Sequence, residues 1–163
     1  MSTTVTAATF IKGSTGNGAT LSIGGATVAG TPSTAFTGVG GITDITGAGL
    51  KLGTVATTDL TSRLVRRIGT TIDGQTYTFT VKNAMSDAGQ TACTAALMAA
   101  VPFDFQVVYT DLTASMTVTV AFSALVTSAG AIDLEDDKVN TSKIELTLDG
   151  VPTVTTVPIV PIA

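Results

Sequence analysis

The stretch TYTFTVK, residues 76–82, indicates the fold class, because apolar and polar side chains alternate along its whole length. Tyr77, Phe79 and Val81 alternate with threonines and a lysine, and a period of two is typical of a strand with one buried face. Threonine, valine and aromatic residues also favour the pleated surface of a sheet. The stretch therefore predicts a β-strand that packs one face on a core.

The same alternation recurs on both sides of this stretch. The apolar positions are Phe103, Phe105, Val107 and Tyr109, then Met116, Val118, Val120 and Phe122, then Ile144, Leu146 and Leu148, with shorter fragments at Leu21 and Ile23 and at Ile42 and Ile45. Several strands at this spacing predict a mainly β, antiparallel protein.

Residues 86–100, SDAGQTACTAALMAA, break the period and predict one α-helix. Ser86 or Asp87 can cap its start, and Asp87 with Gln90 has the spacing of a capping box. Pro102 is expected to end the helix, because the residue before a proline resists the α region. One stripe of small and apolar residues is expected to pack on the sheet: Ala92, Cys93, Ala96, Leu97 and Ala100.

The composition suggests that subunits bury apolar surface against each other. Of 163 residues, 44% are hydrophobic and 12% are charged, and the mean hydropathy is +0.48. No apolar run is long enough for a membrane helix, so membrane insertion is not expected. The first ten residues lack the pattern of a secretory signal. An obligate oligomer is the simplest way to bury the apolar excess.

The residue types present disfavour an enzyme. The chain has no histidine and a single cysteine, Cys93, which excludes histidine-based triads, a disulfide framework and a thiolate metal cluster. The glycines of residues 13–20 lack the lysine of a phosphate-binding loop, so a turn is expected there. We expect no catalytic residue, no metal and no cofactor. The net charge of −4 disfavours a protein that grips nucleic acid by its phosphates.

Three stretches are expected to be loops or arms. Residues 24–41 are glycine-rich and are expected to lack regular structure, and residues 57–74 form a long connection between two strand candidates. The C-terminal residues 151–163 carry three prolines, which predicts an extended edge or a polyproline-like arm that docks on its own or a neighbouring subunit.

Two groups of charged residues are candidates for contacts between subunits. The basic group, Arg63, Arg66 and Arg67, could pair with carboxylates of the next subunit or belong to a solvated loop. A nucleic-acid contact is less consistent with the acidic residues on both sides of this group. The acidic run DLEDD could be a solvated or ion-paired surface, or a calcium site, although it lacks the glycine and spacing of a calcium loop. The candidates are Asp59, Arg63, Arg66, Arg67, Asp133, Glu135, Asp136 and Asp137.

Residues 40–97 also resemble the major tail proteins, or tail tube proteins, of long-tailed, siphovirus-like bacteriophages. The likeness follows the order of a DI-G-G strand, a TVATTDL strand, a polar loop with arginine, a G--D-G turn, an aromatic strand and a helix opening near D-GQ-A. The strands around residues 103–109 and 116–130 fit the same order. The matching positions are Asp44, Ile45, Gly47, Gly49, residues 54–60, Arg63, Gly69, Asp73, Gly74 and Gln90.

The resemblance implies a β-sandwich or barrel with one flanking helix, in hexameric rings that stack into a hollow tube for double-stranded DNA. It implies a virion tail location after assembly in the host cytoplasm, with a tape-measure protein, tail tip and tail terminator as partners. A single domain over residues 1–163 is expected, with a core at about 40–150, an N-terminal region at 1–39 and a C-terminal arm at 151–163. Expected lumen-facing residues are Thr76, Thr78, Thr80, Thr117 and Thr119.

Two other functions are compatible with this sequence. One is a β-sandwich binding module, such as a phage decoration or adhesin domain, and the other is the tube subunit of a secretion apparatus. The glycine-rich and proline-rich segments favour assembly over a free-standing module, because apolar arms need a surface to cover them.

Overall fold

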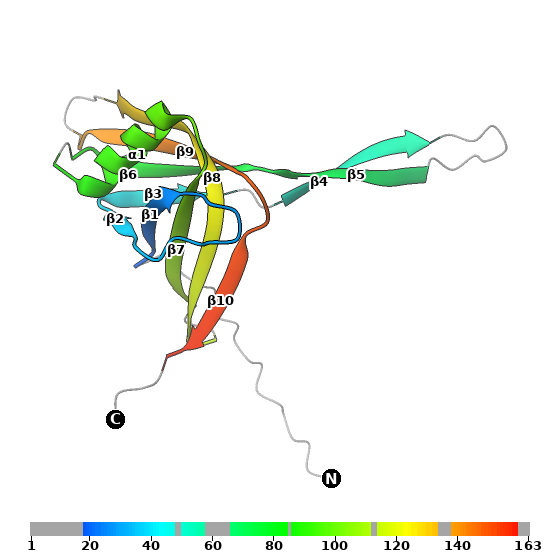
Figure 1. Ribbon diagram of the computed structural model, residues 1–163. Helices are drawn as coiled ribbons and strands as arrows, with labels where there is room; N and C mark the ends of the chain where they lie inside the picture. Colours follow the sequence, from blue (N-terminus) through cyan, green and yellow to red (C-terminus); the bar gives the residue numbers. More distant parts are fainter. Residues whose placement is uncertain are drawn as a thin grey trace, which may run out of the picture.

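A computed structural model describes residues 18–47, 50–57, 66–84, 86–111, 114–133 and 138–159. The described part is mainly antiparallel β with one helix, as the alternating stretches predict (Figure 1). The elements are β1 (Thr20–Ala26), β2 (Thr37–Val39), β3 (Ile42–Thr46), β4 (Leu50–Thr57), β5 (Arg66–Gly74), β6 (Thr76–Lys82), α1 (Ala88–Ala99), β7 (Phe103–Asp111), β8 (Met116–Asp133), β9 (Thr141–Leu148) and β10 (Thr153–Pro158).

Most strands form a single sheet in the order β2-β1-β7-β8-β9-β6-β3, and β4 and β5 form a separate two-stranded sheet. The long strand β8 organises the larger sheet. Its second part pairs with β9, and its first part pairs with β10 on the same side. Figure 1 shows β7, the first part of β8 and β10 extending away from the helix-covered body.

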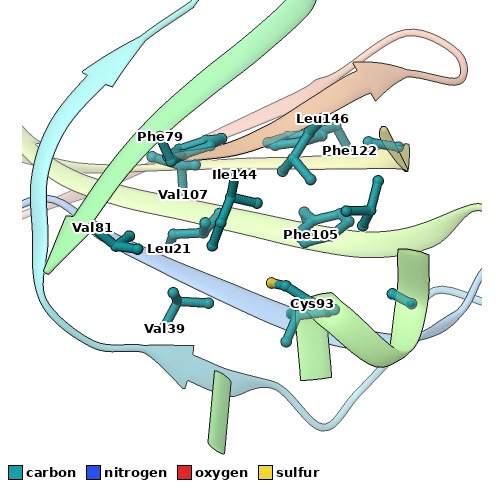
Figure 2. Packing of buried hydrophobic residues seen from close by; sticks show 14 of the residues in the cluster. Leu21, Val39, Phe79, Val81, Cys93, Phe105, Val107, Phe122, Ile144 and Leu146 are labelled. Carbon is teal, nitrogen blue, oxygen red and sulfur yellow. The ribbon is translucent and has the colours of Figure 1, made fainter. Parts of the chain in front are cut away.

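The core lies between one face of the larger sheet and α1 (Figure 2). Phe79, Phe105 and Leu21 are fully buried on this face, and Cys93 meets them from the helix. Burial, with a smaller contribution from the charge of Asp87, raises the pKa of the Cys93 thiol to about 12. The thiol is therefore an inert packing group, as expected from the sequence.

The start of α1 connects the two ends of the larger sheet. Asp87 caps the helix by accepting a hydrogen bond from the Gln90 backbone, and its carboxylate also accepts from Gly40 N, between β2 and β3. The Gln90 amide donates to the carbonyls of Gly40 and Lys82 and accepts from Ala84 N. Half of the predicted capping box is confirmed, while the Gln90 side chain ties β2 and β6 to the helix.

The predicted helix is confirmed with shorter bounds, and one of its stripe residues is wrong. Ala100 is the C-cap, with φ of 52° in the left-handed region, and its side chain is exposed. Cys93 and Ala96 are buried, while Ala92 and Leu97 pack against the core. The stripe therefore stops one turn earlier than predicted.

Two loop predictions are also wrong in part. Residues 24–41 are not irregular throughout, because β1 extends to Ala26 and β2 begins at Thr37. Backbone pairing of β1 with β7 and of β2 with β1 supplies the hydrogen bonds that glycine-rich sequence alone does not predict. Residues 66–74 are strand β5 rather than loop. The C-terminal prediction is confirmed for its described part, since Thr153–Pro158 is an extended strand that pairs with β8, while residues 160–163 lie outside the described residues.

Candidate assembly surface

The hairpin of β4 and β5 extends from the body of the molecule (Figure 1). Among the described residues, its two strands pair with each other and with no other strand. A two-stranded hairpin is only marginally stable by itself in water. Its large apolar side chains are 43–59% exposed, at Leu50, Leu52, Val55, Ile68 and Ile72. The hairpin therefore presents apolar surface that the described part of its own chain leaves uncovered.

An irregularity in the pairing divides these side chains between the two faces of the hairpin. Leu52 pairs with Ile72, and Val55 pairs with Ile68, so β4 spans three residues where β5 spans four. Strand residues an odd number apart lie on opposite faces, and the extra residue in β5 is a β-bulge. Ile68 and Ile72 would share a face without the bulge. With it, Val55 and Ile68 form one apolar pair and Leu52 and Ile72 another, on opposite faces.

The far end of the hairpin is basic. Arg66 pairs with Thr57 and Arg67 with Ala56 at the end of the hairpin away from β6. The Arg67 side chain is exposed. The predicted contact residues Asp59 and Arg63 lie outside the described residues, and Arg66 is described by its backbone alone. The structure thus places two of the three arginines on β5, where the sequence predicted a loop.

The end of β8, at which the acidic run begins in the sequence, lies on the side of the body opposite the hairpin. β8 ends at Asp133, whose backbone pairs with Thr141 at the start of β9, and Figure 1 shows this end across the body from the hairpin. The Asp133 side chain and Glu135, Asp136 and Asp137 lie outside the described residues. Within one chain, the structure does not bring the basic end of the hairpin near the end of β8.

The threonine candidates share one face of the larger sheet. Thr76 pairs with Thr147, which pairs with Leu125 of β8. Leu125 lies an even number of residues from Thr119 along a regular part of β8, so all belong to the face opposite the core. Thr76 is exposed and its hydroxyl is 3.2 Å from that of Thr147. The other candidates on this face, Thr78, Thr80, Thr117 and Thr119, are half-buried.

The loop between β1 and β2 crosses the same outer face and is held there by Asp104. Thr27 Oγ1 donates to one carboxylate oxygen at 2.7 Å, and Ser33 N donates to the other at 2.8 Å. Partial burial acts to raise the pKa of Asp104, but these hydrogen bonds and one from the Ser33 side chain lower it overall. A cavity of about 350 Å³ lies under this loop. The ionised carboxylate is one of the groups that hold the loop, together with the Pro102 carbonyl, which accepts from Thr27 N at 2.9 Å.

A second cavity lies at the end of the body away from the hairpin, between the start of α1 and the strands β8 and β9. Its volume is about 360 Å³. Its lining includes Gln90 and Thr94 of the helix, Ala129 and Gly130 of β8, and Ser142 and Ile144 of β9.

Sites of other kinds do not emerge from the part of the chain that the structure describes. That part contains no group of three or more acidic, cysteine or histidine residues placed to hold a metal ion. Within the same residues, no helix is both long and apolar enough to cross a membrane.

The exposed apolar residues of the hairpin are the candidates that the sequence did not reveal. Ile68 and Ile72 are four residues apart, a spacing that predicts a shared face in a regular strand, but the bulge between them places them on opposite faces. A usable signal was present in β4, where Leu50 and Leu52 alternate with Lys51 and Gly53. That alternation predicts a strand before residue 57 and therefore a partner strand after it.

Comparison with known proteins relates the chain to others by fold alone. No protein-family model matches the sequence, and no curated protein matches it. The fold does match solved structures. The anti-feeding prophage cap, described as a tube-terminating cap, is 13% identical with a TM-score of 0.57, covering 96% of this chain and 95% of that one.

Two tail structures give similar values. A subunit of the SPP1 tail tube is 14% identical with a TM-score of 0.59, covering 86% of this chain and 77% of that one. A subunit from the tail of an empty GTA particle is 13% identical with a TM-score of 0.56, covering 83% and 94%. These structures belong to tails and tube caps rather than to enzymes. The chain therefore has the fold of tail-tube and tube-terminator proteins.

Proposed function

We propose that this chain is a structural virion protein of a long-tailed, siphovirus-like phage. Hexameric rings of the chain stack into the hollow tail tube through which double-stranded DNA passes to the host. Subunits assemble in the host cytoplasm, and a tape-measure protein, tail tip and tail terminator are their partners. The proposal combines a tail-tube fold with an apolar, exposed hairpin.

The hairpin is the observation that carries the proposal. Five large apolar side chains stay 43–59% exposed on a two-stranded sheet that extends from the body. Burying a valine or isoleucine side chain fully contributes about 1.5–3 kcal/mol. In a self-assembling protein, a second copy of the same chain provides the surface that covers such side chains.

The positions of the charged ends favour stacking in one direction. The basic end of the hairpin and the end of β8 lie on opposite sides of the body. Contacts between two different patches are heterologous, and they generate rings or open filaments. We infer that Arg63, Arg66 and Arg67 meet Asp133, Glu135, Asp136 and Asp137 of the next copy, with Asp59 close to the same contact.

The outer face of the larger sheet is the proposed lining of the channel. Thr76, Thr78, Thr80, Thr117 and Thr119 give this face neutral hydroxyl groups. Neutral groups and a net charge of −4 provide little attraction for phosphates, so DNA slides without being held. An enclosing barrel built from many subunits leaves a water-filled channel.

A second candidate is a subunit that ends a tube instead of extending it. The matched anti-feeding prophage structure is a tube-terminating cap, and it covers nearly all of this chain. We expect a subunit that ends a tube to stop growth at that end, whereas a tube subunit adds ring upon ring. A secretion-apparatus tube subunit would polymerise in the same way as a phage tube protein.

Negative-stain electron microscopy of the purified protein at low and high concentration tests the proposal. Rings that stack into hollow tubes of increasing length support a tube subunit. Single rings that never lengthen favour a terminator. Compact monomers at every concentration, with or without a preformed tail tip, contradict both and favour a binding module.

A further inference from the structure

We propose that residues 27–36, the strap that connects β1 to β2, form the narrowest part of the channel as an uncharged collar around the DNA. This inference rests on the proposed lining of the channel by the outer face of the larger sheet. It adds a segment that the threonine candidates do not include, and this segment lies wholly within the described residues.

The strap crosses the face that carries the lining candidates. β1 and β2 are neighbours in the sheet, yet the strap between them reaches over β7 and β8 toward the start of β10 (Figure 1). Thr27 Oγ1 donates to Asp104 of β7 at 2.7 Å and lies 2.8 Å from Ser123 Oγ of β8. Asp104 pairs with Ser123, which lies an even number of residues from Thr119 along a regular part of β8. These side chains therefore share the face of Thr119.

The strap stands away from the sheet. A cavity of about 350 Å³ lies between it and the strands, with Ala121 and Ser123 of β8 and Thr153 of β10 in the opposite wall. Residues 28–32 in the middle of the strap are exposed, and Val28 is 61% exposed. Layers packed face to face on a sheet lie about 10 Å apart. In a ring of subunits, the strap would therefore reach further toward the channel axis than the threonine side chains.

Contacts with the body hold both ends of the strap. Thr27 N donates to the Pro102 carbonyl at 2.9 Å, and Ser33 N donates to Asp104 at 2.8 Å. The end at Ser33 also packs directly on β1, where a Cβ at Gly24 would lie only 2.8 Å from Ser33 Cβ. The strap is therefore constrained at both ends, as a collar of fixed width requires.

The strap covers the one charged side chain of this part of the face. Among the described outward-facing residues of β7, β10 and residues 116–126 of β8, Asp104 alone is charged. Both of its carboxylate oxygens accept hydrogen bonds from the strap, and residues 27–36 carry no charged side chain. Because the collar offers no cation to a phosphate, DNA passes it without being held.

Selective labelling of cysteine variants of the full-length chain tests the collar. Val28→Cys is the test variant. Thr155→Cys marks the proposed lining, because Thr155 is exposed and pairs with Thr119 on the same face. The native Cys93 does not interfere, since burial raises its pKa to about 12. Each variant is treated with N-ethylmaleimide and, separately, with a maleimide coupled to serum albumin, which is too wide to enter a channel for one DNA duplex.

The labelling of Val28→Cys should depend on the size of the reagent only after assembly. We expect N-ethylmaleimide to label it in monomers and in tubes, and the albumin reagent to label it in monomers alone. In tubes, Thr155→Cys should be protected from the albumin reagent in the same way. Thr91→Cys, at an exposed position of α1, is the control that should react with both reagents in both states.

The alternative results separate this inference from the proposed function. If tubes form and the albumin reagent labels Val28→Cys but not Thr155→Cys, the collar is wrong and the lining stands. If N-ethylmaleimide fails to label Val28→Cys in tubes, position 28 lies in a contact between subunits, which also overturns the collar. Labelling of Thr155→Cys by the albumin reagent overturns the proposed lining together with the collar. If no tube forms, the tube function fails and the collar fails with it.

A shortened strap gives a second test. Two glycines in place of residues 28–32 keep Thr27 and Ser33, and a short link can join these residues because both contact the Asp104 carboxylate. Electron cryo-microscopy of the resulting tubes should show a channel that is wider at the level of the strap by roughly 10–20 Å and unchanged elsewhere. An unchanged width at that level overturns the collar. If the shortened chain does not assemble, the labelling result decides the question, because Val28→Cys keeps the strap intact.

Discussion

Val55 and Ile68 face each other across the two strands of the β4–β5 hairpin, and both side chains are more than half exposed. Both side chains contact solvent in the monomer, where exposed apolar residues do not add to its stability. The pair is a part of the surface on which the proposed assembly depends, and the predictions below begin with it.

Val55→Asp is expected to prevent polymerisation while the monomer stays folded. An aspartate at an interface carries a buried charge into a site that held an apolar group. We expect the concentration needed for assembly to rise at least about tenfold, with an unchanged melting temperature of the monomer. Val55→Ile, which keeps the apolar branched shape, is the control and should assemble normally. Sedimentation of both variants checks the prediction, and normal assembly of Val55→Asp contradicts it.

Replacing Arg63, Arg66 and Arg67 together with glutamate is expected to leave a folded monomer that does not stack into tubes. Like charges would then meet at the proposed contact with the acidic run. A variant with three lysines keeps the charge but loses the planar fork, so it should assemble weakly and with stronger salt dependence. If the glutamate variant polymerises like the parent chain, these arginines are ordinary solvated surface.

Gly89→Ala is expected to destabilise the monomer, although alanine favours a helix by about 1 kcal/mol over glycine. A Cβ at position 89 would collide with the backbone of Gly38 and Val39, so α1 would have to move away from β2. We expect a loss of about 1–3 kcal/mol in the free energy of unfolding, measured in urea. Gly38→Ala is the control, because its Cβ would meet open space. Equal stabilities of the two variants would refute this packing.

Asp104 is expected to make the position of the loop between β1 and β2 depend on pH. The pKa of Asp104 is lowered in the folded state, so its stabilising effect is fully present above the unfolded value of about 3.9 and is lost as pH falls through the folded value. The difference in melting temperature between the parent chain and Asp104→Ala should therefore be constant near neutral pH and shrink in acid.

Thr27→Val removes one donor to the same carboxylate and is the matched variant. The stabilisation that is lost in acid should be smaller in Thr27→Val than in the parent chain but still measurable, because Ser33 still donates to Asp104. If the difference in melting temperature between the parent chain and Asp104→Ala stays constant down to the most acidic condition, the ionised form of Asp104 contributes nothing to stability.

The elements predicted well from sequence are those that pack on the chain's own core. Phe79 and Val81, or Ile144 and Leu146, alternate because one face of each strand is buried. The helix was predicted from alanine-rich sequence and from Asp87, whose cap contact is local. Local signals are enough wherever propensity, period and burial agree.

The elements predicted poorly depend on pairing with distant residues or on another subunit. β1 and β2 contain several glycines, and their hydrogen bonds come from β7 and from each other. The bulge in β5 places Ile68 and Ile72 on opposite faces, although their spacing of four residues predicts a shared face. These two residues cover no core of their own chain, so no pattern within one subunit marks them as buried. The Gln90 contacts to Gly40 and Lys82 join segments far apart in sequence and could not be predicted locally.

Electron cryo-microscopy of the assembled protein tests the central proposal most directly. The account predicts a hollow tube of stacked rings in which the sheet face that bears Thr78 and Thr119 lines the channel, and each hairpin contacts the next ring. A tube whose channel is lined by α1, or hairpins that contact no neighbouring subunit, would contradict it.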